Sequence, residues 1–162
     1  MALATAIAVG AAVAAARVSG DIRRWYPVPI GLPRASLFVS ADRAALYRSA
    51  SAFIESCAAA DDPIFVAPDI PLLYFISDRR NPTPYDLTIP GNVDGRLIIE
   101  RLEASRTRCV VFNPRMYPEF PPFGDLFPDL EGYLGRSYRR TEIIRGGGTE
   151  WHGLVRRGRP ER

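Results

Sequence analysis

Residues 108–112 read Arg-Cys-Val-Val-Phe, and together with the run Ile-Phe-Val-Ala at residues 64–67 they decide the fold class. Both runs are short and continuously apolar, which is typical of strands that are buried on both faces of a parallel sheet. A helical pattern of apolar residues lies between them at residues 93–105. Strand, helix and strand in this order predict a right-handed crossover and a parallel pair. The chain is therefore expected to contain an α/β domain.

Further elements flank this unit. Ser40 stands at a helix N-cap position, and the helix is expected to run to about Ala59. A short edge strand is expected at residues 35–39. Two later strands, residues 141–145 and 150–156, are joined by Gly-Gly-Gly-Thr. These glycines are expected to form a flexible hairpin, because a phosphate-binding glycine loop should lead into a helix.

The sequence thus predicts a small α/β fold of two or three layers around a sheet of about four to five strands. Its features are a parallel core pair, a C-terminal antiparallel hairpin and one N-terminal hydrophobic helix. A length of 162 residues fits one domain with a short appendage. We expect a partial transmembrane helix with its interface at residues 1–26 and a proline-rich linker at 27–33. The soluble domain is expected at residues 34–157, with Asn92 capping one of its helices, and a disordered tail at 158–162.

The N-terminal segment has the composition of a membrane or export sequence. Residues 1–16 carry no charged side chain. They are shorter than the roughly 20 residues that a spanning helix needs. Three interpretations are open, namely the end of a longer transmembrane helix, the apolar core of a signal peptide and an Ala-rich soluble helix. We prefer the first. The arginines that follow, with Trp25 and Tyr26, are typical of a bilayer interface. The positive-inside rule alone would place the following domain in the cytoplasm.

The composition argues against several classes of function. All 21 basic residues are arginine, the formal net charge is +3, and the arginines are scattered among acidic residues. A nucleic-acid-binding surface is therefore not indicated. Cys57 and Cys109 cannot form a zinc cluster, and buried free thiols are expected rather than a single disulfide. With His152 as the only histidine, no metal site and no cofactor is expected.

The best candidate site is the stretch from Tyr74 to Leu87 together with the carboxyl ends of the two strands, where ligands bind in open α/β sheets. Arginine side chains there could bind a phosphate or carboxylate, and Asp and Asn side chains could form hydrogen bonds with hydroxyl groups. The alternative is structural, because Asp and Asn-Pro sequences also build turns. No general base can be assigned, which disfavours a free-standing enzyme. The candidate ligand-binding residues are Asp69, Asp78, Arg79, Arg80, Asn81 and Arg115.

Three motifs resemble one family of membrane enzymes. Residues 72–83 read Leu-Leu-Tyr-Phe-Ile-Ser-Asp-Arg-Arg-Asn-Pro-Thr, residues 113–120 read Asn-Pro-Arg-Met-Tyr-Pro-Glu-Phe, and residues 146–151 read Gly-Gly-Gly-Thr-Glu-Trp. Together they are similar to the C-terminal soluble regions of bacterial multi-pass glycosyltransferases of the GT-C superfamily, the protein-mannosyltransferase and aminoarabinose-transferase-like enzymes. The resemblance covers residues 34–156. It implies an extracytoplasmic domain on the bacterial inner membrane, in an enzyme that takes sugar from a polyprenyl-phosphate donor.

One departure from the family limits this expectation. Such enzymes carry their catalytic acidic residue in a loop of the membrane bundle, which this chain does not contain, so no catalytic role passes to Asp61 or Asp62. We therefore expect a separated or truncated C-terminal piece, or a gene fragment, that is inactive alone. Its expected partners are the membrane, the transmembrane bundle and the sugar donor or acceptor. The alternative is a membrane-anchored module that binds an anionic sugar or phosphate through Arg79, Arg80 and Arg115. A fold without any ligand is the third reading.

Overall fold

A four-stranded mixed sheet forms the centre of the protein, in the order β3-β4-β6-β5. The structure is a computed structural model that describes residues 2–91, 93–115 and 120–158. Strand β3 (Ile64–Ala67) runs parallel to β4 (Cys109–Phe112), with Ile64 opposite Cys109. Strand β6 (Thr149–Arg156) is antiparallel to both β4 and β5 (Tyr138–Gly146). The predicted α/β class, parallel pair and C-terminal hairpin are confirmed.

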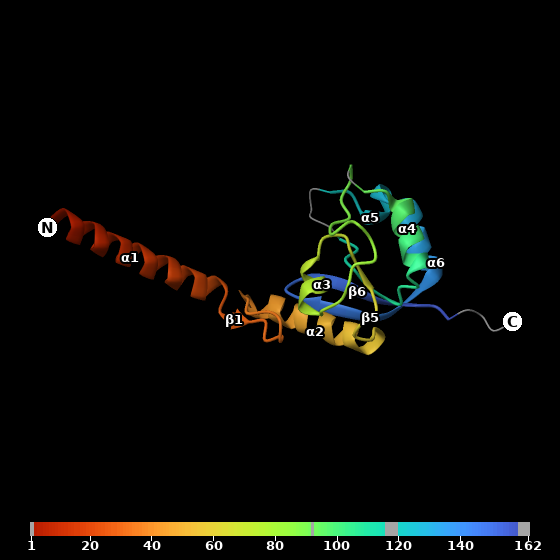
Figure 1. Cartoon of the computed structure of the whole chain (residues 1–162), viewed down its shortest axis with the longest axis horizontal. Helices are drawn as coiled ribbons and strands as arrows, with labels where there is room; N and C mark the ends of the chain where they lie inside the picture. Colours follow the sequence, from red (N-terminus) through yellow and green to blue (C-terminus); the bar gives the residue numbers. More distant parts are fainter. Residues whose placement is uncertain (1, 92, 116–119, 159–162) are drawn as a thin grey trace.

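Helices cover both faces of this sheet and make three layers (Figure 1). Ile64 and Val66 pack in a core cluster with α2 (Ala41–Cys57) and α3 (Leu72–Ile76). The intervening residues of β3 pack in a second cluster on the other face. That face is covered by α4 (Gly95–Ala104), α5 (Phe123–Leu126) and α6 (Pro128–Ser137). Alternate side chains of one strand therefore enter two separate cores, as a strand buried on both faces requires.

Side-chain caps set where the main helices begin. The hydroxyl of Ser40 accepts a hydrogen bond from the backbone N–H of Arg43 at 3.4 Å, so the predicted N-cap of α2 is confirmed. Helix α4 begins later than predicted, because the carboxylate of Asp94 accepts the N–H of Arg96 at 2.9 Å. Asn92, the cap predicted from sequence, lies outside the described residues.

The edge strand predicted at residues 35–39 does not join the main sheet. Strand β2 (Phe38–Val39) pairs instead with β1 (Val28–Pro29) in a separate two-stranded ribbon, with Val28 opposite Val39. The predicted linker at residues 27–33 therefore contains a strand. Its prolines explain why the ribbon stays short, because proline has no N–H to donate to a longer ladder.

The predicted β5–β6 hairpin is confirmed, and its glycines allow close packing and a tight turn. Gly147 and Gly148 have φ angles of +57° and +73°, which a two-residue turn between antiparallel strands requires. A Cβ on Gly146 would lie 2.6 Å from the carbonyl oxygen of Asp42, in the first turn of α2. The hairpin tip is thus seated on the start of α2.

Helix α1 (Ala2–Trp25) extends away from the rest of the protein (Figure 1). Its side chains Val13, Val18, Ile22 and Trp25 are exposed. Within the described residues, no helix combines the length and the apolar character needed to cross a bilayer. A helix is thus present at the predicted N-terminal position, although it is not clearly hydrophobic. Most of the tail predicted at residues 158–162 lies outside the described residues.

Cys57 and Cys109 form a disulfide, so the prediction of free thiols is wrong. Cys57 is the last residue of α2 and Cys109 is the first residue of β4, and their Cα atoms lie 5.6 Å apart. Both side chains belong to the same core cluster. The sequence did not indicate the pair because the two residues are separated by 52 positions and meet only when α2 packs on the sheet.

We predict that reduction destabilises the folded chain. The disulfide closes a long loop, and opening such a loop costs roughly 2–4 kcal/mol of unfolding free energy. Urea denaturation with and without dithiothreitol measures the loss. The double variant Cys57→Ala/Cys109→Ala is the control, because the reductant should leave its stability unchanged. Incorporation of two alkylating groups by the unreduced, denatured wild-type chain would contradict the disulfide.

Candidate functional site

The segment that follows α3 completes the open edge of the sheet. Strand β3 lies at the end of the strand order, so one side of its backbone lacks a neighbouring strand. The N–H of Ile64 donates to the carbonyl of Arg80 at 3.1 Å, and the N–H of Thr88 donates to the carbonyl of Pro68 at 2.8 Å. Residues 80–88 therefore pass from the amino end of β3 to its carboxyl end. The candidate loop covers a strand edge that would otherwise be unpaired.

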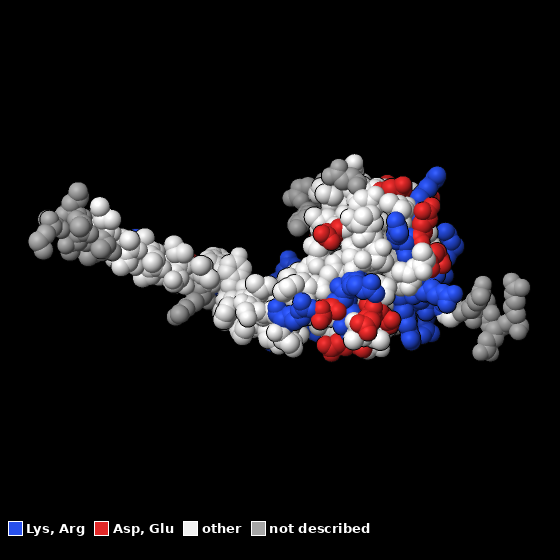
Figure 2. Space-filling view, viewed as in Figure 1, with Lys and Arg blue, Asp and Glu red and all other residues white. Residues whose placement is uncertain are grey.

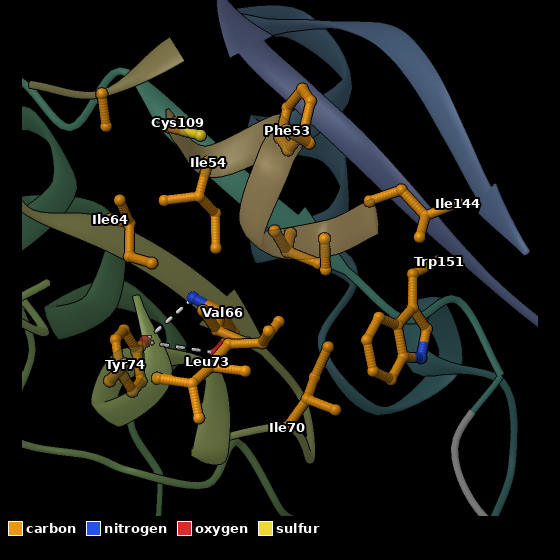
Figure 3. Packing of buried hydrophobic residues seen from close by; sticks show 14 of the residues in the cluster. Phe53, Ile54, Ile64, Val66, Ile70, Leu73, Tyr74, Cys109, Ile144 and Trp151 are labelled. Carbon is orange, nitrogen blue, oxygen red and sulfur yellow. Dashed lines mark hydrogen bonds between the residues drawn. The ribbon is translucent and has the colours of Figure 1, made fainter. Parts of the chain in front are cut away.

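A tyrosine hydroxyl completes the middle of this edge. The N–H of Val66 donates to the Tyr74 hydroxyl at 2.9 Å, and that hydroxyl donates to the carbonyl of Val66 at 3.3 Å (Figure 3). Tyr74 is buried, and this burial raises the pKa of its phenol well above the usual range. The phenol is therefore held as a neutral donor and acceptor, which is the form that both bonds need.

The two adjacent arginines of the motif bind backbone carbonyls. Arg79 donates through Nη1 to the carbonyl of Ser77 at 2.7 Å and through Nη2 to that of Ala58 at 3.4 Å. Arg80 donates through Nη2 to the carbonyl of Asp61 at 3.2 Å. Ala58 is the C-cap of α2, so these cations satisfy carbonyls at and just beyond a helix C-terminus. They tie the candidate loop to the end of α2.

The neighbouring polar residues of the motif also have structural partners. Asp78, at φ +53°, forms an ion pair with Arg34. Asn81 accepts through Oδ1 from the backbone N–H of Thr83 at 2.9 Å and donates through Nδ2 to the carbonyl of Tyr85 at 2.7 Å. This arrangement is a turn stabilised by an asparagine side chain. The Asn-Pro-Thr part of the motif thus fixes the path of the loop as it starts along β3.

Asn113 links two candidate residues at the carboxyl ends of the parallel strands. Its Nδ2 donates to Oδ1 of Asp69 at 3.0 Å, and its Oδ1 accepts the backbone N–H of Arg115 at 3.2 Å. Asn113 is buried, and its own N–H donates to the carbonyl of Ala67 at 2.8 Å. Asn113 is not one of the six candidate residues, although its place directly after a buried strand points to this position.

The six candidate residues therefore do not form one site. The Asp69 carboxylate and the backbone N–H of Arg115 both bond to Asn113 at the carboxyl ends of β3 and β4, where a ligand is expected in this class of fold. Arg79 and Arg80 bind carbonyls near the amino end of β3 instead. In the described part of the chain, no group of three or more His, Cys, Asp or Glu side chains could hold a metal ion.

A second polar cluster joins α4 and α6 to the hairpin. Oε1 of Glu103 accepts from the Tyr133 hydroxyl at 2.7 Å, and its Oε2 accepts from Nη2 of Arg156 at 2.5 Å. Tyr138 donates its hydroxyl to the carbonyl of Thr107 at 2.8 Å. The hydrogen bond from Tyr133, with a contribution from Arg156, lowers the pKa of Glu103. Burial raises the pKa of the Tyr133 and Tyr138 phenols.

This second cluster was missed by the sequence reasoning. Glu103 and Arg156 are separated by 53 positions, and no local pattern marks either of them. The cluster has the partners of a structural clamp, because each of its charges is matched by a hydrogen-bonding group of the same cluster.

Comparisons with known proteins give no relative from which a role could be transferred. No family model matches the chain, and neither a curated protein nor a solved structure matches it.

We predict that Tyr74→Phe destabilises the fold by about 1–3 kcal/mol, because it leaves the N–H and carbonyl of Val66 buried without their partner. Tyr26→Phe is the matched control, since Tyr26 is 51% exposed at the end of α1. Urea denaturation of both variants provides the unfolding free energies. Equal stability of the two variants would show that the Tyr74 hydroxyl does not support the strand edge.

We also predict that the stability contributed by Glu103 depends on pH. Its pKa is lower in the folded state than the ordinary value of 4.5, so its contribution is fully present above that value and is lost as the pH falls through the folded pKa. The difference in unfolding free energy between the wild type and Glu103→Gln should therefore shrink between pH 6 and pH 3. Glu100→Gln on the same helix is the control variant. A Glu103→Gln difference that stays constant across this range would contradict the clamp.

Proposed function

We propose that this chain is a non-catalytic accessory domain, attached through α1 to the transmembrane bundle of a glycosyltransferase that uses a polyprenyl-phosphate sugar. The observation that carries the proposal is the structural use of the Arg-Arg-Asn-Pro-Thr motif. Its arginines bind backbone carbonyls and its asparagine builds a turn. Because these side chains stabilise the backbone of the loop, the motif characterises the fold and not a reaction. This role suits a domain that carries no catalytic residues of its own.

The form of α1 supports attachment to other membrane helices. At a rise of 1.5 Å per residue, the uncharged residues 2–16 measure about 22 Å, less than the roughly 30 Å of a bilayer core. They are rich in alanine, and small residues allow close approach between membrane helices. Trp25 and Tyr26 are exposed at the end of the helix, where they suit the depth of lipid headgroups.

The disulfide supports the extracytoplasmic side of the bacterial inner membrane as the location of the domain. Disulfides persist in oxidising compartments and are rare in the cytoplasm. The link between Cys57 and Cys109 therefore agrees with the topology of the family that the motifs resemble. It argues against the cytoplasmic placement that the positive-inside rule gives.

The geometry gives less support to a binding module built on Arg79, Arg80 and Arg115. Arg79 and Arg80 already donate to carbonyls of the chain. Arg115 is exposed and lies at the other end of β3, next to Asn113. A single ligand phosphate would not reach all three guanidinium groups without rearrangement of the loop.

Photo-crosslinking in cells that naturally produce the chain tests the proposal. A photoreactive phenylalanine analogue replaces Val18, which is 57% exposed on α1. The expected product is an adduct with a multi-pass membrane protein that mass spectrometry identifies as a glycosyltransferase. The control carries the analogue at Glu142, which is exposed on β5. Adducts with lipid alone at position 18, or the same protein adduct at both positions, would contradict attachment through α1.

A further inference from the structure

A pocket lined mainly by arginine residues lies where the β5–β6 hairpin ends. It has a volume of about 370 Å³ and is lined by Arg139, Val155, Arg156, Arg157 and Gly158. Figure 2 shows basic side chains gathered on the part of the surface next to the C-terminal tail. Neither the motifs nor the proposed attachment through α1 involves this pocket.

The strand register places two of these arginines around one apolar residue. Arg139 on β5 lies directly opposite Val155 on β6. Arg157 follows Val155 by two positions. Residues two positions apart on a strand lie on the same face of the sheet, so Arg157 shares the face of Val155 as long as the strand pairing continues. The N–H of Arg157 donates to the carbonyl of Ser137 at 2.9 Å, which continues the pairing past the end of β6. Arg139 and Arg157 are therefore diagonal neighbours, about 7–8 Å apart at the backbone, across an apolar floor.

The charges of this pair are not balanced by the protein. Within the described residues, neither Arg139 nor Arg157 forms an ion pair with a carboxylate. Arg156 differs, because its guanidinium group is held by Glu103 on the opposite face of the hairpin. Two like charges at diagonal positions on one face of a strand pair repel each other, and a bound anion would offset this repulsion.

One of the two guanidinium groups is already oriented. Nε of Arg157 donates to the carbonyl of Tyr138 at 3.1 Å, which fixes the plane of the guanidinium group and leaves its two terminal nitrogens as donors for a ligand. Tyr138 is itself fixed by its hydroxyl bond to the carbonyl of Thr107. Part of the pocket is therefore organised before a ligand enters, which lowers the entropic cost of binding.

We propose that Arg139 and Arg157 bind a phosphate group, with Val155 contacting the apolar part of the molecule that carries it. Guanidinium groups present paired N–H donors that match two oxygens of one phosphate, and two such groups can share the dianion of a phosphomonoester. The ligand class is a phosphomonoester, which either a free small molecule or a lipid headgroup supplies. The site is independent of Arg79, Arg80 and Arg115.

Titration of the full-length, ¹⁵N-labelled chain in non-ionic detergent tests this site. One arm uses inorganic phosphate and the other uses dihexanoyl phosphatidic acid below its critical micelle concentration. The amide signals of Val155 and Gly158 should shift in a saturable manner in at least one arm. Arg139→Gln and Arg157→Gln should each weaken the affinity about tenfold, which corresponds to the loss of one charge-assisted contact of about 1.4 kcal/mol.

Arg145→Gln is the matched control for the loss of one positive charge. Arg145 lies on the same strand at its other end, and its Nη2 pairs with Glu150 at 3.0 Å. This variant should keep the wild-type affinity. Saturation in the phosphate arm identifies a free phosphate as sufficient, and saturation only with the phosphatidic acid identifies a lipid headgroup. Equal weakening by all three variants, or no saturable shift in either arm, would overturn the proposal.

Discussion

The fold depends on satisfying the outer edge of β3. This strand is buried on both faces, so water cannot reach its unpaired backbone groups, and such groups are costly when they stay unbonded. The protein provides three separate partners for that edge, namely the carbonyl of Arg80, the hydroxyl of Tyr74 and the N–H of Thr88. The need to complete this strand edge explains the unusual sequence between Tyr74 and Leu87. Its prolines and asparagine turn the chain, and its arginines fasten the turn to α2.

The two ends of the sheet are held by different groups. The amino ends of β3 and β4 are held by the disulfide and by the arginine contacts with the end of α2. The Glu103 clamp adds a further link there, because Arg156 donates its N–H to the carbonyl of Arg108 beside β4. The carboxyl ends hold Asp69 and Asn113. The amino ends are thus held by a covalent link and by charged side chains, whereas the carboxyl ends are held by neutral and carboxylate hydrogen bonds around Asn113.

Local patterns were sufficient to predict much of this fold. The two apolar runs, the Ser40 cap and the glycines between the last strands each act over a few residues, and each was located correctly. The disulfide, the Glu103 clamp and the arrangement of Arg139 with Arg157 depend on packing and on strand register, which no short window contains. The candidate site was divided for the same reason, since the chain returns through α3 to the amino end of β3, where Arg79 and Arg80 lie, before residues 80–88 run to its carboxyl end. The β1–β2 ribbon was missed because prolines dominate its sequence.

The sealed edge of β3 also decides how copies of this domain can meet. A sheet with one closed side cannot grow by strand addition in that direction, so in the four-stranded sheet intermolecular pairing is left to β5, the strand at the opposite end of the order. That strand has a bulge between Arg140 and Glu142, and most of its residues are exposed and several are charged. Bulges and charges both discourage edge-to-edge polymerisation. The protein thus resists domain-swapped or amyloid-like assembly by geometry on one side and by electrostatic repulsion on the other.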